Sequence, residues 1–281
     1  MSSPTERKRF EHARKLASKL RSFIFKPEPE LSIARFSGME EVARGCMGTV
    51  YHATDSETGR EVAIKTANDS ADARSALKNE AKMLGGLHHP NIVEFLGSGR
   101  IPGRGETPFI VMEFLHGSKL EMQAMRWELL KPALMSLCDA LAAVHDAGIV
   151  HRDVKPDNII LTDKGVKLID FGVAKRTGAI RSMAGLTFNP GNLGYAAPEM
   201  FGLSPDRRSD IYSVGAIMYR ALTGKLPEDM ARFYGNAVLE PALHGGFSEV
   251  VGKALELSPE KRFQSAREMR ERIEALAMLE S

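Results

Sequence analysis

The chain has 281 residues, of which 43% are hydrophobic and 26% are charged. This is the composition of a folded globular protein, and it excludes a disordered, collagenous or coiled-coil chain as the overall description. The 38 basic and 36 acidic side chains leave a formal charge of only +2. Such a balance provides no overall field for binding nucleic acid, so we expect no nucleic-acid partner. The length corresponds to one large domain or two small ones.

The cysteines and the hydropathy pattern predict a cytoplasmic protein. Cys46 and Cys138 are far apart and belong to no Cys/His spacing, so we expect neither a disulfide nor a zinc site. No run approaches the roughly 18 to 20 apolar residues that cross a bilayer, and charged residues occupy the place of a signal peptide's apolar stretch.

Residues 6–26 differ from the rest of the chain, because eight Lys or Arg and two Glu give them a local charge of +6. Their apolar residues recur at helical spacing and are Phe10, Ala13, Leu16, Ala17, Leu20, Phe23 and Ile24. The pattern predicts a basic amphipathic helix that ends at Pro27 and Pro29. Three roles stay open for it: packing on the rest of the chain, peripheral contact with an anionic membrane surface, or an arm that binds a partner or inhibits the protein itself. We assign residues 1–34 to this extension and a linker.

The rest of the chain changes character near residue 113. Between residues 35 and 113, short β-branched runs alternate with turn residues, and one helical stretch, 70–87, interrupts them. Beyond residue 114 the periodicity is mainly helical, over 128–146, 209–223, 249–257 and 265–279. We therefore expect an α+β protein with two lobes: a small sheet with one helix over 35–113, and a larger, mainly helical part over 114–281.

Two weak signals lie in the first lobe. Gly45 and Gly48 lie between two strand-like runs, where glycine lets backbone N–H groups approach a phosphate. By itself, such a pair of glycines is a turn. Lys65 ends the strand-like run 62–65, and Glu80 lies on the helical stretch that follows. Taken singly, both residues are solvated surface charges.

The strongest pattern lies in the second lobe. The string His151-Arg152-Asp153 is followed by Lys155 and Asn158, and Asp170-Phe171-Gly172 comes after eleven intervening residues. Phosphoryl transfer needs these residue types: a carboxylate that accepts the proton of the attacking hydroxyl, and a cation that neutralises the phosphoryl group. An amide and a second carboxylate supply the hard oxygen ligands that Mg²⁺ prefers.

Taken together, these strings resemble the protein kinase family. The resemblance runs from about Arg35 to Leu279, and the motif around Arg262 is similar to the bacterial, eukaryotic-like (Hanks-type) Ser/Thr kinases. It implies the two-lobed protein kinase fold, with a small antiparallel sheet and one helix in the N-lobe and a larger, mainly helical C-lobe. It also implies ATP and Mg²⁺ (or Mn²⁺) as cofactors and a protein as substrate.

The resemblance also implies roles for the matched residues of the second lobe. Asp153 is the expected base, and Lys155 is the expected cation at the γ-phosphate. Asn158 and Asp170 are the expected metal ligands.

The resemblance places an ATP site largely in the first lobe. Lys65 is expected to bind the α- and β-phosphates while paired with Glu80. Met112 is expected to limit the depth of the adenine pocket, and backbone groups of Glu113 and Leu115 to bond to adenine. The full set expected around ATP is Val42, Ala43, Arg44, Gly45, Cys46, Met47, Gly48, Val50, Ala63, Lys65, Met112, Glu113, Leu115, Ile160 and Asp170.

Other matched residues have supporting roles. Glu199 of the A-P-E string is expected to pair with Arg262, and Asp210 to support the catalytic loop. Lys155 is typical of members that act on Ser or Thr. Arg152 marks members in which a phosphate on the activation segment orders that segment. We therefore expect autophosphorylation there, with Thr177, Ser182 and Thr187 as candidate acceptors.

Two positions depart from the family pattern. Ala43 replaces the first glycine of the loop, and an alanine is tolerated at this position if its φ is negative. Asn192 stands where Ser/Thr members place a threonine that bridges the catalytic aspartate and lysine. We predict an ATP-dependent protein Ser/Thr kinase, and the alternative is a pseudokinase that binds nucleotide or a partner without transfer. A kinase of small molecules is disfavoured, because such enzymes lack the features around Arg152, Lys155 and Glu199.

Overall fold

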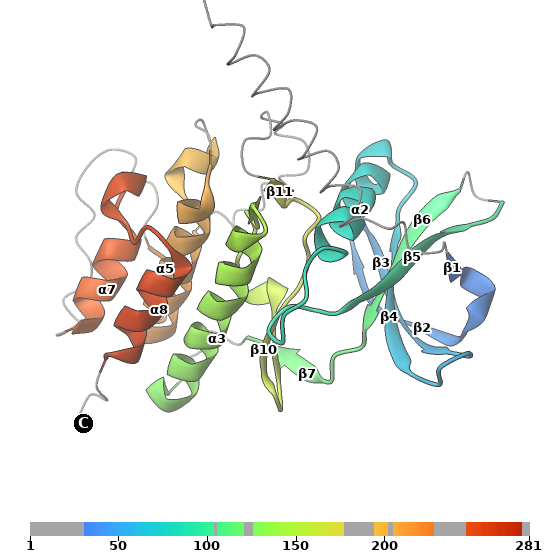
Figure 1. The fold of residues 1–281 in the computed structure, drawn as a ribbon, viewed down its shortest axis with the longest axis horizontal. Coiled ribbons are helices and arrows are strands. Elements are labelled where there is room, and N and C mark those ends of the chain that lie inside the picture. Colours follow the sequence, from blue (N-terminus) through green and yellow to red (C-terminus); the bar gives the residue numbers. More distant parts are fainter. Residues whose placement is uncertain are drawn as a thin grey trace, which may run out of the picture.

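The computed structural model describes residues 31–103, 106–120, 126–176, 194–201, 205–227 and 246–276. The basic segment 6–26, Asn192 and the candidate acceptors Thr177, Ser182 and Thr187 lie outside these ranges. The described part consists of a smaller portion built on a sheet and a larger portion built on helices (Figure 1). This is the α+β architecture that the sequence predicts.

A six-stranded sheet forms the smaller portion, with the strand order β1-β5-β6-β4-β3-β2. Its elements are β1 (Leu31–Ser32), the 3-10 helix η1 (Ile33–Arg35), β2 (Phe36–Gly45), β3 (Gly48–Asp55), β4 (Glu61–Ala67), β5 (Phe95–Ile101) and β6 (Thr107–Glu113). Neighbouring strands are antiparallel except β1 and β5, which pair in parallel. The sheet thus begins at Leu31, within the range 1–34 that the sequence assigns to the extension.

The two faces of this sheet pack against different neighbours. Val62 and Ile64 of β4 belong to a small core with Phe36, Phe109 and Val111. Because side chains alternate along a strand, Ala63 and Lys65 lie on the other face.

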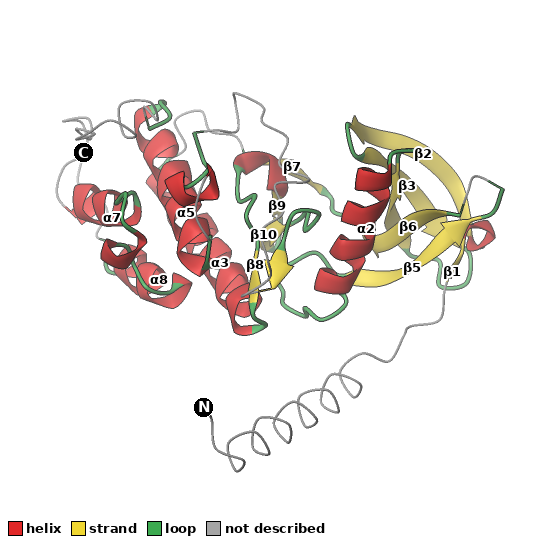
Figure 2. Cartoon of the chain, turned by 90° about the horizontal axis from the view of Figure 1, so that it is seen from above, coloured by secondary structure: helices red, strands yellow, loops and turns green. Residues whose placement is uncertain are grey.

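Helix α2 (Ala71–Leu84) packs against β4, β5 and β6 (Figure 2). Ser70 caps its first turn, because Ser70 Oγ accepts a hydrogen bond from the Ala73 amide at 3.1 Å. The predicted end at residue 87 is wrong by three residues. The helix ends at Leu84 because Gly85 and Gly86 follow, and glycine is a poor helix former.

The larger portion holds the helices α3 (Trp127–Asp146), α5 (Arg207–Thr223), α7 (Gly246–Ala254) and α8 (Ala266–Glu274). Its shorter elements are β7 (Gly117–Lys119), β8 (Ile149–Val150), η2 (Pro156–Asn158), β9 (Ile159–Thr162), β10 (Gly165–Leu168), β11 (Lys175–Arg176), η3 (Pro198–Phe201) and η4 (Pro259–Lys261). All four predicted helices are present, but their ends differ from the prediction.

Side-chain hydrogen bonds lie at three of these helix ends. Helix α5 starts two residues early because the Asp206 carboxylate caps it, accepting from the Arg208 amide at 2.8 Å. Helix α7 ends at Ala254, before the predicted residue 257, and Arg262 binds the carbonyls of Glu256 and Leu257 just beyond this end. Helix α8 ends at Glu274, where Lys131 Nζ binds the carbonyls of Glu274 and Leu276, each at 2.7 Å; the predicted end at residue 279 lies outside the described ranges.

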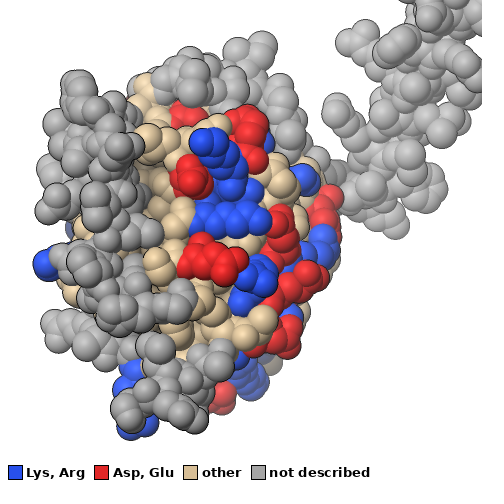
Figure 3. All heavy atoms as spheres, turned by 90° about the vertical axis from the view of Figure 1, so that its left-hand side faces the viewer, with Lys and Arg blue, Asp and Glu red and all other residues tan. Residues whose placement is uncertain are grey.

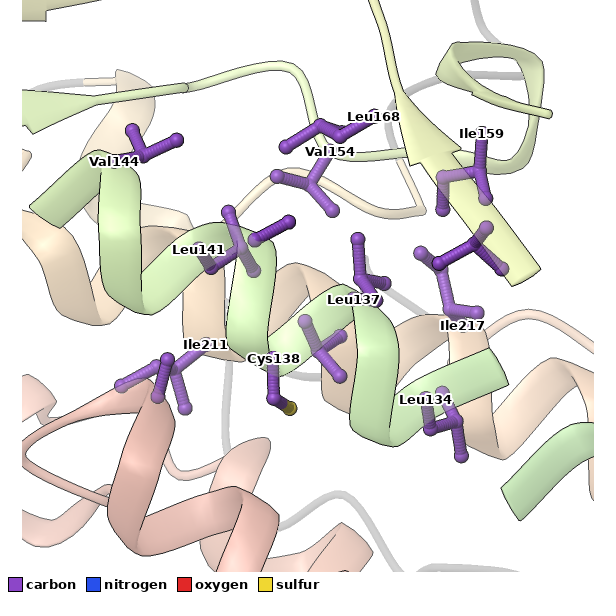
Figure 4. Close-up of a cluster of buried hydrophobic side chains, with 14 of the residues drawn as sticks. Leu134, Leu137, Cys138, Leu141, Val144, Val154, Ile159, Leu168, Ile211 and Ile217 are labelled. Atoms are coloured by element: carbon purple, nitrogen blue, oxygen red, sulfur yellow. The ribbon is translucent and has the colours of Figure 1, made fainter. Parts of the chain in front are cut away.

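Helix α3 lies at the centre of the larger core (Figure 4). Leu134, Leu137 and Leu141 are each at most 1% exposed. In Figure 4 the side chains of α3 are surrounded by Val154 of the 151–158 loop, by residues of β9 and β10, and by Ile211 of α5. The apolar stripe of α3 therefore supports the loop that carries the predicted catalytic residues.

Charged side chains of both signs lie on the described part of the far end of the larger portion. Basic and acidic groups are interspersed on this face (Figure 3). Ion pairs link α8 to its neighbours and are Arg267–Asp146, Arg270–Asp139 at 2.9 Å and Arg272–Glu249 at 2.6 Å. Within the described ranges, no helix is both long and apolar enough to cross a membrane.

Candidate active site

Three charged side chains, from a strand, a helix and the segment after β10, meet where the two portions join. Lys65 Nζ of β4 lies 2.7 Å from Glu80 Oε2 of α2 and 3.0 Å from Asp170 Oδ1, which follows β10. The side chains of Lys65, Glu80 and Asp170 are 15%, 2% and 43% exposed. A lysine that strand alternation alone would leave in solvent is thus placed between two carboxylates.

Burial and charge have opposite effects in this triad. Burial raises the pKa of Glu80 to about 7. The Lys65 ammonium acts in the opposite direction, because it favours the charged carboxylate, but its effect is smaller. Burial disfavours the charged form of Lys65, but the two carboxylates outweigh it and raise the pKa of Lys65. The pKa of Asp170 is lowered, because Lys65 and the Gly172 amide outweigh the effect of burial. Lys65 and Asp170 are therefore both charged at neutral pH.

The 151–158 loop brings three more predicted residues together. Lys155 Nζ lies 2.8 Å from Asp153 Oδ2, and Asn158 Nδ2 lies 2.9 Å from the same oxygen. Asn158 Nδ2 also donates to the Asp153 carbonyl at 2.8 Å. The Asp153 side chain is 29% exposed. Two donors therefore fix the orientation of this carboxylate while it stays accessible.

Asp210 of α5 holds the start of the same loop from the interior. Its carboxylate is fully buried and accepts hydrogen bonds from the backbone amides of His151 at 2.9 Å and Arg152 at 2.8 Å. His145 Nε2 of α3 lies 2.8 Å from Asp210 Oδ2. Burial alone would raise the pKa of Asp210, but hydrogen bonds from His145 and the loop hold it below its ordinary value. Arg152 has a φ of 71°, and the bond to its amide stabilises this unfavourable conformation.

A second ion pair lies deep in the larger portion. Arg262 is 1% exposed and donates to both oxygens of Glu199, at 2.6 and 2.9 Å. Ser209 Oγ donates to Glu199 Oε1 at 2.7 Å, and three backbone carbonyls accept from the guanidinium. This pair, expected from the sequence, is almost completely satisfied and joins η3 to the residues before α8.

The two predicted loop glycines flank the turn between β2 and β3. Gly45 and Gly48 are paired across it. A Cβ at position 48 would lie 1.9 Å from the Thr66 carbonyl oxygen, whereas one at position 45 would have nothing within 4 Å. Gly48 is therefore required by packing, and Gly45 leaves open space. Ala43 lacks a positive φ, because the described non-glycine residues with one are Glu106, Arg152 and Asp170.

The predicted adenine contacts lie on adjacent strands and the segment that follows them. Ala63 of β4 is paired with Met112 of β6, which is 8% exposed. Glu113 and Leu115 continue the chain from Met112 into the larger portion. Ile160 is in β9, between its register partners on β7 and β10.

The other residues expected around ATP lie on β2, β3 and their turn. Val50 pairs with both Ala43 and Lys65, so it links the turn to the triad. Met47 packs against the larger core. Three further residues of this set are exposed: Val42, Arg44 and Cys46.

Three residues near the site were not foreseen from the sequence. Asn79 donates through Nδ2 to the Ala174 carbonyl at 2.8 Å, and His145 holds Asp210 as described. Lys167 Nζ lies 2.5 Å from Glu113 Oε1. The only sequence signal that could have pointed to Asn79 is its position next to Glu80. The sequence carries no such signal for His145 or Lys167, because their partners are distant in the chain.

The predicted metal ligands have the oxygen atoms that Mg²⁺ requires. Asn158 turns its Nδ2 towards Asp153, which leaves its side-chain carbonyl oxygen for a metal ion. Asp170 Oδ1 accepts from Lys65 and from the Gly172 amide, and no bond to Oδ2 is found among the described residues. In phosphate sites Mg²⁺ is held by one or two such side chains together with phosphate and water oxygens. The donor set therefore fits Mg²⁺.

Two portions of this kind, sharing one set of charged residues at their junction, have the architecture of a protein kinase. The protein kinase domain family matches residues 36–242, and the chain belongs to this family. The two-lobed kinase fold expected from the sequence is thereby confirmed. The sheet portion is its N-lobe, and the helical portion is its C-lobe.

The chain is similar to several bacterial proteins. It is 35% identical to the "Probable serine/threonine-protein kinase SCO3848" of Streptomyces coelicolor, over 88% of this chain and 41% of that protein. It is 38% identical to the serine/threonine-protein kinase PknK of Mycobacterium tuberculosis, over 69% of this chain and 18% of that protein. It is 31% identical to the serine/threonine-protein kinase pkn2 of Myxococcus xanthus, over 89% of this chain and 33% of that protein. The chain thus spans less than half the length of these relatives.

Proposed function

We propose that this chain is an ATP-dependent protein kinase that transfers the γ-phosphate of ATP to Ser or Thr hydroxyls of proteins. The observation that carries the proposal is that Lys65, Glu80 and Asp170 are in contact, while Asp153 is oriented by Lys155 and Asn158. Each group that transfer requires is therefore present and already placed beside its partner. The printed names of the bacterial relatives support the same assignment.

Asp153 is proposed as the base. The hydroxyl oxygen of the substrate attacks the γ-phosphorus, its proton passes to Asp153, and the bond from the γ-phosphorus to the bridging oxygen of ADP breaks. Lys155, 2.8 Å from Asp153, neutralises the transferring phosphoryl group. Lys65 holds the α- and β-phosphates, and Glu80 fixes its position.

Asn158 and Asp170 are proposed to hold Mg²⁺ (or Mn²⁺), which when bound neutralises charge on the phosphates. Ala63 and Ile160 are proposed to lie on the two faces of adenine, and the segment 112–115 along its edge. The turn 42–50 then covers the phosphates with its backbone amides.

Arg152 supports the proposal that a phosphate on the activation segment regulates the enzyme. Its Nε is buried without a hydrogen-bond partner among the described residues, and burial lowers the pKa of the guanidinium. A bound anion would satisfy this group. Thr177, Ser182 and Thr187 are proposed as the acceptors of autophosphorylation.

We also propose a cytoplasmic location and a protein substrate. The lobes are proposed to be residues 35–113 and 114–281, with β1 (Leu31–Ser32) added to the N-lobe because it pairs with β5. The extension 1–34 is proposed to contact a membrane surface or a partner through its basic segment 6–26, because that segment carries a charge of +6.

The proposal is tested by incubating the full chain with radiolabelled ATP and Mg²⁺ or Mn²⁺, with and without a generic basic protein. The wild type should label itself or the added protein, and Asp153→Asn should not. Binding of a fluorescent ATP analogue by Asp153→Asn controls for folding. Nucleotide binding without any transfer by the wild type would contradict the proposal in favour of a pseudokinase.

A further inference from the structure

The residues just after Asp170 form a tight turn. The Ala174 amide donates to the Phe171 carbonyl at 3.1 Å, which closes the turn over residues 171–174. Phe171 is fully buried, and its ring packs edge-to-face on His151 with centroids 4.6 Å apart. Asp170 itself has a φ of 63°, which is unfavourable for a non-glycine residue. The conformation of Asp170 therefore depends on what holds this turn in place.

Two consecutive residues of α2 hold it. Glu80 binds Lys65 at 2.7 Å, and Lys65 in turn binds Asp170, the residue just before the turn, at 3.0 Å. Asn79 Nδ2 donates to the Ala174 carbonyl at 2.8 Å and to the Gly172 carbonyl at 3.4 Å. Thus α2 reaches Asp170 through Lys65 and binds the turn directly through Asn79, which donates to two of its carbonyls. An amide –NH₂ group has two hydrogens and can serve both carbonyls, whereas a carboxylate of the same shape has none.

We infer that Asn79 is a positioning residue for the transfer reaction: it ties α2 to the 171–174 turn and thereby aligns Asp170 with Lys65. The inference rests on the proposed function, because it assigns Asn79 a role in placing the metal ligand. Asn79 touches neither Lys65 nor Asp170 through any contact found among the described residues, so it acts through the turn. Loss of its two bonds removes the direct link between α2 and the turn, without removing any group that is proposed to contact ATP.

Three variants of the full chain test this inference. Asn79→Asp keeps the shape and sets a carboxylate against two carbonyl oxygens, and Asn79→Ala removes the contact. Lys78→Ala is the matched control, because Lys78 is the exposed preceding residue on the same helix. The measurements are kcat and KM for ATP, the melting temperature, and hydrogen–deuterium exchange of the peptide covering residues 169–176.

Asn79→Asp should lower kcat by about tenfold, which corresponds to an increase of roughly 1–2 kcal/mol in the activation free energy. KM for ATP should change by less than about threefold. Asn79→Ala should show a smaller loss of kcat. Both variants should accelerate exchange over 169–176, and Lys78→Ala should match the wild type. Wild-type kcat, or lowered kcat with unchanged exchange over 169–176, overturns the inference. If the wild type itself transfers no phosphate, the proposed function fails, but the exchange measurement still decides whether Asn79 holds the turn.

Discussion

The two main ion pairs of the molecule differ in how completely their charges are satisfied. Glu199 and Arg262 lie within the C-lobe, and hydroxyl and carbonyl groups surround them. Glu80 and Lys65 join β4 to α2 in the N-lobe, and Glu80 Oε1 is buried without a hydrogen-bond partner among the described residues. A buried, unpaired oxygen costs roughly 1–3 kcal/mol. The C-lobe pair is thus almost fully satisfied, whereas the N-lobe pair leaves one buried oxygen unpaired and holds Lys65 at the proposed ATP site.

The largest effect is expected from removing the N-lobe cation. Lys65→Met should lower phosphate transfer by roughly 10²–10³-fold, because one charged donor at the phosphates is lost. Stability should change little, because Glu80, with its pKa already near 7, can take up a proton when Lys65 is gone. Transfer assays and urea unfolding measure the two effects, and Lys82→Met on the exposed side of α2 is the control. A large loss of stability in Lys65→Met would remove the contrast between the pairs.

Breaking the C-lobe pair should have the opposite outcome. Arg262→Met leaves Glu199 as an uncompensated buried charge, which costs about 3–5 kcal/mol. The melting temperature should fall by roughly 10 °C. The double variant with Glu199→Gln should recover part of this loss, since the stranded charge is removed. A single variant as stable as the wild type would show that the pair does not anchor the C-lobe.

Asp210→Asn tests the support of the catalytic loop. The asparagine amide would place an –NH₂ donor where an Asp210 oxygen now accepts from a backbone N–H group. We therefore expect the free energy of unfolding to fall by roughly 1–3 kcal/mol and phosphate transfer to become slower. The folded-state pKa of Asp210 lies below its unfolded value, so the stability it provides is present above about pH 4 and is lost as the pH falls further. Urea unfolding from pH 7 to pH 3 should therefore show a steeper acid loss in the wild type than in the variant. Equal slopes would contradict this assignment.

The smallest effect should separate the two loop glycines. Gly48→Ala should destabilise the N-lobe and raise KM for ATP several-fold, because the added methyl group meets the Thr66 carbonyl. Gly45→Ala should preserve stability, because nothing lies within 4 Å of its added Cβ. Thermal unfolding and the ATP dependence of transfer distinguish the two. Equal stability in both variants would show that β3 and β4 can shift apart at Gly48 and Thr66 without loss of stability.

Much of the site follows from the sequence because the C-lobe contacts are local. Asp153, Lys155 and Asn158 lie within six residues of one another, so their order in the chain nearly determines their contacts. The helix ends were predicted less well. Capping by Asp206 and the carbonyl contacts of Lys131 and Arg262 depend on neighbours that hydrophobic periodicity does not reveal.

The sequence by itself determined the family, the residue types of the site and the two-lobed architecture, since these depend on motifs and on periodicity along the chain. Only the tertiary structure decided how the lobes share the site. Lys65 meets Asp170 across 105 residues, and Asn79 meets Ala174 across 95. Such contacts form only when β4, α2 and the end of β10 pack together, so no local pattern specifies them. The same packing buries Glu80 and raises its pKa, which no property of an isolated glutamate on a helix predicts.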